Sequence, residues 1–276
     1  MSQFPSAPPA SHGWLDLVLG PSGGKTVLTR QDGRSPLHVQ SVLHGEGRVA
    51  DVVLLNVAGM ILGGDRQDLR VEVLAGGHAH LRTVGATHLH RAEPAAPAQS
   101  RVTLHAGSDA LLEYFPGVVI PHAGAWFQQD MMLNLAPGGH AVVAEIVSPG
   151  RLHSGEAFAY KCLALSLSAG CAGSPLVTDA LMLEPGTWSF GRAALFGPYT
   201  HLATLYALGP RADATLADEL HALVQRHGAH GGATPGHRDA VVLRALGHSA
   251  HSLAQLLHAV LACCRRHMLG RAGLGR

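Results

Sequence analysis

A period of 31 residues recurs in the middle of the chain and constrains its fold more than any other feature. Three similar turns follow one another at this spacing: A-G-G-H-A-H-L (75–81), A-G-S-D-A-L-L (106–112) and P-G-G-H-A-V-V (137–143). The same spacing relates His122 to His153 and Phe127 to Phe158. A fixed period of this length is typical of stacked supersecondary units. We therefore predict a repeating unit of strand, Gly-containing turn, strand and loop. The alternative is a β-rich chain that meets glycine turns at this spacing by chance.

Alternation of apolar and polar residues predicts strands through most of the chain. In 69–75, Leu69, Val71 and Val73 share one face, while Arg70 and Glu72 lie on the other. This is the period-2 pattern of a half-buried strand. The other strands are expected at 14–19, 26–30, 37–44, 49–56, 78–84, 101–105, 110–115, 125–135, 140–147, 157–167 and 176–183.

Helical periodicity begins after Pro210. A helix is predicted over 214–227, with an apolar face of Leu216, Leu220, Leu223 and Val224 and a stop at Gly228. A Gly/His loop at 228–237 and a short strand at 241–246 should follow. A second helix, capped by Ser249 or Ser252, should then run through His267.

The predicted fold class is mostly β: one large domain of stacked strands wound in solenoid-like fashion, with two α-helices near the C-terminus. Residues 1–12 are rich in Pro, Ser and Ala and are expected to form a disordered tail. The domain should cover 13–276, with a β body at 13–210 and a helix-strand-helix end at 211–276. No linker separates these two parts.

Charge and cysteine usage exclude several classes of function. The formal net charge is +1, which gives no electrostatic reason to expect binding to nucleic acid or to an anionic membrane. No apolar run approaches the length of a membrane-spanning helix, and no signal-peptide pattern is present. The four cysteines form no C-x-x-C pair, which favours a reducing, cytoplasmic setting.

No catalytic motif emerges, so we do not expect an enzyme. The segment G-P-S-G-G-K-T at 20–26 resembles a phosphate-binding loop, but that motif needs glycine where Leu19 stands. A strand pattern follows it in place of the required helix. We interpret it as a glycine turn between two strands.

Histidines are unusually frequent, with 20 in the chain. His78 and His80 should share one strand face, and so should His88 and His90, because strand side chains repeat every two residues. Two imidazoles with a carboxylate suit Ni²⁺, Zn²⁺ or Cu²⁺. The spacing of a closed structural site is absent, however, and hydrogen-bonded strand histidines are the simpler interpretation of each pair.

Two carboxylates stand inside apolar strand patterns. Glu113 shares a face with Leu111 and Phe115, and Glu145 shares a face with Val143 and Val147. Burial of an unpaired carboxylate costs several kcal/mol or raises its pKa. Each acid therefore needs either an arginine, such as Arg151 or Arg91, or a hydrated polar path through the apolar body. The sequence leaves both alternatives open.

A set of short motifs, taken in order, resembles one known family. The set comprises G-G-K-T-V-L (23–28), P-L-H-V-Q (36–40), L-L-N-V-A-G-M-I-L-G-G-D (54–65), G-A-T-H-L-H-R (85–91), L-E-Y-F-P (112–116), I-P-H-A-G-A (120–125), E-I-V-S-P-G-R (145–151) and G-E-A-F (155–158). In this order they resemble the urease accessory protein family UreD, called UreH in some systems. The resemblance spans roughly Gly13 to Gly270.

The resemblance implies a non-catalytic scaffold or chaperone. Such proteins sit between UreF, the GTPase UreG and apo-urease, and they help to deliver nickel to the urease active site through an internal passage. Their fold is a large, mostly β body with two helices. The resemblance implies no tightly bound cofactor or metal site, and only transient contacts to Ni²⁺.

The family pattern also implies roles for particular residues. Asp65, Thr87, His88 and Glu145 match positions associated with the passage. Further signature positions, whose role could be structural, are Glu113, Arg151 and Glu156. The alternative function is that of a stand-alone, His-rich nickel-binding or nickel-storage protein. Several tight nickel sites on the isolated chain would favour that alternative.

Overall fold

The computed structural model describes residues 10–44, 49–91 and 96–269. Most of the predicted tail, residues 1–9, lies outside these ranges. Its last residues belong to the folded body, since Ser11 donates its backbone N–H to Asp65 and the first strand starts at His12. Residues 10–12, which the sequence analysis assigned to the tail, are thus part of the described structure.

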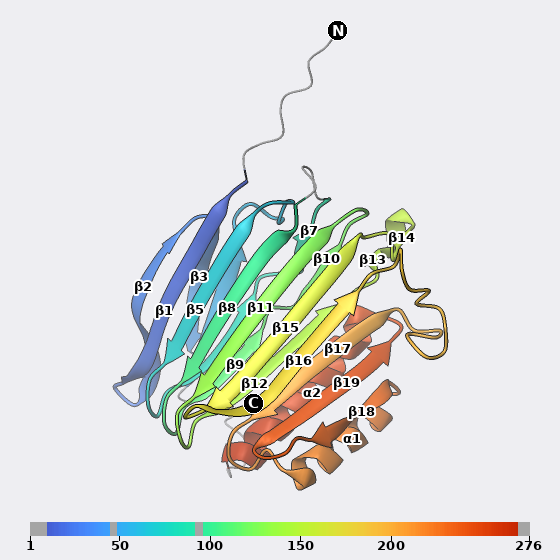
Figure 1. Cartoon of the computed structure of the whole chain (residues 1–276). Helices are drawn as coiled ribbons and strands as arrows, with labels where there is room; N and C mark the ends of the chain where they lie inside the picture. The colour runs from blue at the N-terminus through green and yellow to red at the C-terminus, as the bar shows by residue number, and fades with distance from the viewer. Residues whose placement is uncertain (1–9, 45–48, 92–95, 270–276) are drawn as a thin grey trace.

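Within these ranges, the strands form a seven-stranded sheet, a ten-stranded sheet and one short hairpin (Figure 1). The first, sheet A, contains β16 (Ser174–Leu183), β15 (Cys162–Cys171), β11 (Trp126–Leu135), β8 (Ala98–Ala106), β5 (Arg66–Val73), β1 (His12–Ser22) and β2 (Lys25–Arg34), in that order. The second, sheet B, contains β18 (His230–Pro235), β19 (Ala240–Gly247), β17 (His201–Leu208), β12 (His140–Val147), β9 (Leu111–Phe115), β6 (His78–Thr83), β4 (Ala50–Asn56) and β3 (Leu37–His44) in that order. In addition, β10 (Val118–Pro121) pairs with β12, and β7 (Thr87–Leu89) pairs with β10. The hairpin joins β13 (Gly150–Arg151) to β14 (Glu156–Ala157) around the 3-10 helix η1 (Leu152–Ser154).

The 31-residue period is confirmed as a structural repeat. Strands β5, β8 and β11 lie parallel in sheet A, and β6, β9 and β12 lie parallel in sheet B. A glycine turn carries the chain from one sheet to the other in each coil. Gly76 and Gly138 adopt positive φ, as their turns require. A Cβ on Gly107 would lie 2.7 Å from the backbone nitrogen of Ala75, so the coils stack only with glycine there.

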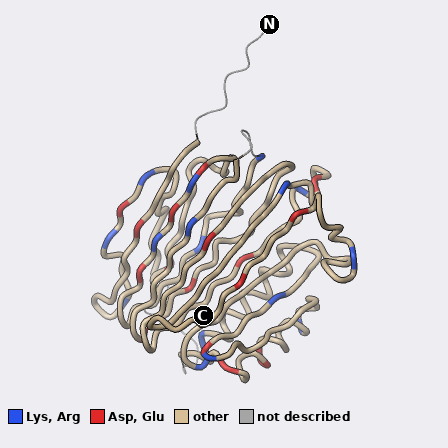
Figure 2. Tube along the Cα trace, in the orientation of Figure 1, with Lys and Arg blue, Asp and Glu red and all other residues tan. Residues whose placement is uncertain are grey.

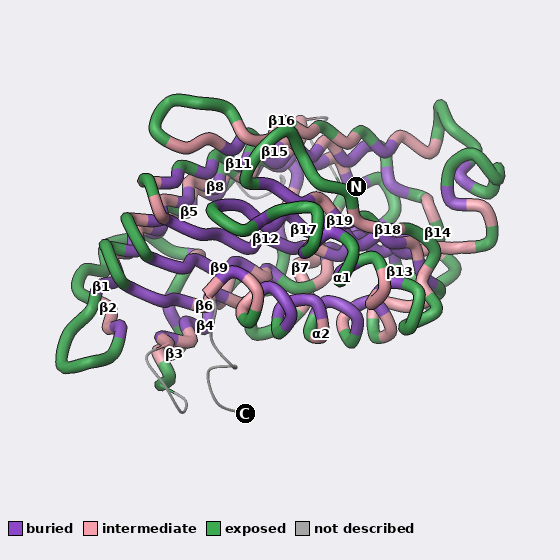
Figure 3. Tube along the Cα trace, turned by 90° about the horizontal axis from the view of Figure 1, so that it is seen from below, coloured by how far each residue is buried: buried purple, intermediate pink, exposed green. Residues whose placement is uncertain are grey.

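Buried residues line the space between the two sheets, as the tube coloured by burial shows (Figure 3). Leu17, Leu104 and Leu133 from sheet A pack against Leu112 and Val143 from sheet B. The strands of sheet A also carry charged residues of both signs (Figure 2), and in β5 these alternate with the buried residues and so lie on the outward face. One face of each of these strands is buried and the other is exposed, which explains why apolar and polar residues alternate along them in the sequence.

Two helices cover the other face of sheet B in the described residues. These are α1 (Ala214–Arg226) and α2 (Ala250–Leu269). Asp213 caps α1 by accepting from the backbone N–H of Leu216, and Ser249 accepts from that of Ser252 at the start of α2. Both predicted helices are confirmed. Their apolar faces pack on β12, β17 and β19.

Three local predictions were wrong. The predicted strand at 157–167 is broken, because Phe158 adopts positive φ and β15 begins only at Cys162. The predicted Gly/His loop at 228–237 contains the edge strand β18. Strand β17 was missed, because it is buried along its whole length and therefore shows no apolar-polar alternation.

Candidate functional site

A cavity of about 290 Å³ lies between the two sheets, at the end where the β4–β5 and β6–β7 loops meet. Exposed residues of these loops, Met60 and Val84, form its outer part. Thr87 and His88 of β7 also line it. The buried side chains of Gln67 and Gln129 line it further in, so polar groups reach into an otherwise apolar core.

Gln129 connects this cavity to the carboxylate of Glu145. Its Nε2 donates to Glu145 Oε2 over 3.0 Å. A second cavity of about 20 Å³, enough space for one water molecule, is lined by both side chains. Burial raises the pKa of Glu145; the hydrogen bond from Gln129 offsets this in part. Glu145 forms no ion pair with any described residue, which leaves its carboxylate dependent on an amide and on the small cavity.

At the small cavity that Glu145 lines, a hydrogen-bonded cluster bridges the two sheets. Asp179 of β16 accepts hydrogen bonds from the Tyr206 hydroxyl of β17 and from the Arg244 guanidinium of β19. Tyr206 and Arg244 also line the small cavity. This cluster was not predicted from the sequence, because β17 was missed and the pairing of β19 with it was unknown.

Three of the four predicted passage residues thus belong to one connected region: Thr87 and His88 line the larger cavity, and Glu145 lines the smaller one. Asp65 is placed apart from both cavities. Its carboxylate accepts from the backbone N–H of Ser11 over 2.7 Å and from that of Leu62 over 2.9 Å. In this structure Asp65 anchors the loop before β5, and contact between Asp65 and nickel stays a prediction.

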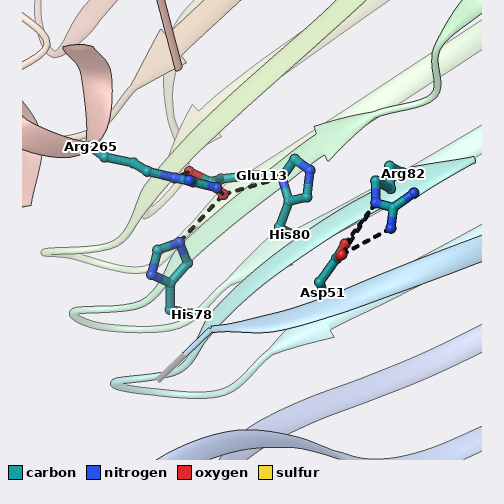
Figure 4. Close-up of polar contacts among 6 residues, drawn as sticks. All are labelled: Asp51, His78, His80, Arg82, Glu113 and Arg265. Carbon is teal, nitrogen blue, oxygen red and sulfur yellow. Dashed lines mark hydrogen bonds and ion pairs between the residues drawn. The ribbon is translucent and has the colours of Figure 1, made fainter. Parts of the chain in front are cut away.

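Glu113 lies on the opposite face of sheet B from Glu145, although both acids were considered for one path. It is fully buried beneath α2, where Arg265 Nε donates to Glu113 Oε1 over 2.6 Å (Figure 4). His78 and His80 lie 3.4 and 3.3 Å from its other oxygen. Burial alone would raise the pKa of Glu113, but these contacts, led by Arg265, hold it well below its usual range.

The partner of Glu113 is therefore Arg265, and neither Arg151 nor Arg91 as considered from the sequence. His78 and His80 do share a strand face, as predicted, and they flank an arginine-carboxylate pair there. Arg151 instead pairs with Glu156 across the exposed β13–β14 hairpin. Glu156 also accepts from the backbone N–H of Ala123, and the two contacts lower its pKa to about 2.

His122 is a site residue that the sequence analysis missed. It follows β10 and brings its Nε2 to 3.1 Å from His88 Nδ1. The His90 ring also lies beside it, with the ring centroids 5.4 Å apart. The signal available was its place in the I-P-H-A-G-A motif, but only the pairing of β10 with β7 shows that it faces His88.

Across the residues that the structure describes, no three His, Cys, Asp or Glu side chains are arranged to hold one metal ion. The four cysteines are free thiols. Of the helices in the described ranges, none combines the length and apolar character needed to span a bilayer. The arrangement is thus a polar region inside an apolar body, with single ligand-type side chains spaced along it.

Comparisons with known proteins place this chain. The family model described as "UreD urease accessory protein" matches residues 11–275. A urease accessory protein UreD of Cenarchaeum symbiosum is 30% identical over 94% of this chain and 93% of its own length. A UreD protein of Haloarcula marismortui is 32% identical over 95% of this chain and 88% of its own length. A UreD protein of Ralstonia nicotianae is 31% identical over 94% of this chain and 90% of its own length. The match covers both sheets and both helices, and with it the cavity and its polar lining, so this chain belongs to the urease accessory protein UreD family.

Proposed function

We propose that this chain is a non-catalytic scaffold that links apo-urease to UreF and the GTPase UreG and passes nickel to the urease active site. One observation carries the proposal. A series of polar groups runs from His88 and Thr87 through Gln129 to Glu145, inside the apolar space between the two sheets. Family membership supports the role in urease maturation, and the polar series supplies the route.

The chemistry of these groups suits a mobile divalent cation. Imidazole nitrogen, hydroxyl and carboxylate oxygen are all ligands of Ni²⁺. Burying Glu145 without a cationic partner is costly, and a passing cation would offset that cost. Because the ligands are spaced along the series, an ion at any one position contacts only a few of them. It is therefore bound weakly and released easily. Nickel is thus cargo, and no tightly bound cofactor is expected.

The same proposal places the protein in the cytoplasm, because its cysteines are free thiols and a reducing compartment keeps them so. The nucleotide chemistry belongs to UreG. The charged outward face of sheet A has both signs interspersed and gives no reason to expect a nucleic-acid or membrane partner (Figure 2).

The proposal is tested by nickel loading of urease in a reconstituted system with UreF and UreG. Asp65→Ala combined with Glu145→Ala should lower the urease activity that develops after nickel is supplied. A matched variant, Asp16→Ala with Glu72→Ala, removes two carboxylates from the outward face of sheet A and should load urease like the wild type. Unchanged loading with the first variant would remove both acids from the route.

The His-rich storage alternative is separated by equilibrium dialysis of the isolated chain against Ni²⁺. The scaffold proposal expects weak binding. Several tight sites per chain would favour storage, and the dependence of urease loading on Glu145 should then disappear.

A further inference from the structure

Three histidines from two parts of the sequence meet beside the larger cavity, which His88 lines. His88 lies in β7, His90 follows that strand, and His122 follows β10, which pairs with β7. The ring centroids of His88 and His122 are 5.3 Å apart, and those of His90 and His122 are 5.4 Å apart. His88 and His90 are partly exposed, so the cluster is open to ions from outside.

The two facing nitrogens of His88 and His122 have the separation of neighbouring metal ligands. His88 Nδ1 and His122 Nε2 are 3.1 Å apart. Two imidazoles bound at right angles to one metal, with metal–nitrogen bonds of about 2.1 Å, hold their nitrogens about 3.0 Å apart. A cation bound to both nitrogens at this separation would lie to one side of the line that joins them, so each ring would turn to aim its lone pair at the ion, and the ion would replace their mutual hydrogen bond.

His122 also carries a buried polar atom that lacks a partner. Its side chain is 9% exposed, and its Nδ1 makes no hydrogen bond in the described structure. This atom points away from Nε2, so an ion bound at Nε2 would not satisfy it; a water molecule that accepts from an Nδ1–H would, and would leave the Nε2 lone pair free to bind a metal. Whichever of the two rings donates in the His88–His122 contact, this atom stays unsatisfied, so the protein alone does not complete the cluster.

The surroundings of His122 favour its neutral form. Burial lowers the pKa of His122, and the nearby Arg151 lowers it further, while Glu156 acts in the opposite direction. Arg151 and Glu156 form an ion pair, so their charges largely cancel at the cluster.

We propose that His88 and His122 form a two-imidazole binding site for a borderline divalent cation such as Ni²⁺ beside the larger cavity, with the His90 ring next to it. Water completes the coordination shell, which makes the site weak and exchangeable. The identity of the cation as cargo rests on the proposed function, but the binding site itself does not. A site here would load the cation at the outer end of the polar series.

The test uses the full-length chain with Ni²⁺ alone. NMR spectra of protein labelled at the histidine rings are recorded while substoichiometric paramagnetic Ni²⁺ is added. The signals of His88 and His122, assigned by their loss in His88→Gln and His122→Gln, should broaden first. Equilibrium dialysis of either variant should show Ni²⁺ binding at this site weakened about tenfold or more.

Two further variants keep the outcome clear. His90→Gln, at a partly exposed position, should weaken binding without the risk to folding that the buried His122 carries. His105→Gln removes a histidine from the outward face of sheet A and should change nothing. The proposal is overturned if other histidines broaden while His88 and His122 do not, or if His88→Gln, His122→Gln and His90→Gln all bind Ni²⁺ like the wild type.

The result also separates this site from the proposed function. If Ni²⁺ fails to bind here but urease loading still depends on Glu145, the site is wrong and the passage stands. If Ni²⁺ binds here but loading is indifferent to Glu145, the site is right and the passage is wrong.

Discussion

Arg265 of helix α2 binds the fully buried carboxylate of Glu113, although 152 positions separate the two residues. The guanidinium group of Arg265 donates from Nε to one carboxylate oxygen of Glu113 and from Nη2 to the other. The pair lies between sheet B and α2 (Figure 4) and ties the last helix to the middle of the repeat. A carboxylate in this position is therefore explained by structure, and needs no role in transport.

Arg265→Met should destabilise the protein by about 3–5 kcal/mol, because it leaves the Glu113 charge buried without its main partner. The free energy of unfolding is measured by urea denaturation. Adding Glu113→Gln to Arg265→Met should restore much of the loss, since the amide carries no charge to desolvate.

A nearby pair provides the matched control for this prediction. Arg82 binds Asp51 with similar geometry, but its side chain is 40% exposed against 27% for Arg265, and Asp51 is 28% exposed against 0% for Glu113. Arg82→Met should therefore cost no more than about 1 kcal/mol. Equal losses for Arg82→Met and Arg265→Met would mean that burial of Glu113 does not govern the pair.

The repeat and the two helices were predictable from the sequence because they depend on local pattern. Glycine turns such as those at Gly76 and Gly138 recur at a fixed period, and the helices show their own apolar faces. The relation between Glu113 and Glu145 was not predictable in this way. Each acid could be assigned to a face of its own strand, but only the register of β9 on β12, which aligns Glu113 with Val142, puts the two acids on opposite faces of sheet B.

The same limit applies to the candidate site. Thr87, His88 and Glu145 came from motifs that resemble a family, and the structure brings them to two cavities that share the side chain of Gln129. His122 and Arg265 were missed because their partners lie far away in the sequence. Contacts of this kind depend on how the coils stack and on where a helix packs against the sheet. Local periodicity in the sequence does not encode them.

Glu145→Gln should stabilise the protein at neutral pH, and the gain should shrink as the pH falls. Burial raises the pKa of Glu145 in the folded state above its unfolded value. The fold therefore favours the protonated acid. The contribution of the protonated acid to stability is fully present at pH values below the pKa of Glu145 in the unfolded chain. It is lost as the pH rises through the higher pKa of Glu145 in the folded protein. The neutral amide avoids this loss at every pH.

This prediction is checked by urea denaturation of wild type and Glu145→Gln between pH 4 and pH 8. Glu72→Gln, on the outward face of sheet A, controls for removal of one negative charge. A difference between Glu145→Gln and wild type that is constant with pH would show that titration of Glu145 does not contribute.

Asp65→Ala should lower the free energy of unfolding by about 1–3 kcal/mol for each backbone donor left unpaired. The donors are the N–H groups of Ser11 and Leu62, which the Asp65 carboxylate now accepts. Proteolysis should become faster at the loop between β4 and β5. Asp65→Asn keeps an acceptor oxygen and should be milder in both measurements. If Asp65→Ala is as stable as the wild type, its carboxylate is free for a role other than anchoring.

The central claim is that nickel moves through the space between the two sheets, and it is tested most directly by filling that space. Ser100 of β8 lines the larger cavity, whereas Ser168 of β15 is exposed on the outward face of sheet A. The measurement is nickel-dependent urease activation in the reconstituted system, with assembly on UreF, UreG and apo-urease verified for each variant. Ser100→Phe should reduce activation to near the level seen without this protein, while Ser168→Phe should activate like the wild type. Full activation by an assembled Ser100→Phe complex would contradict the account.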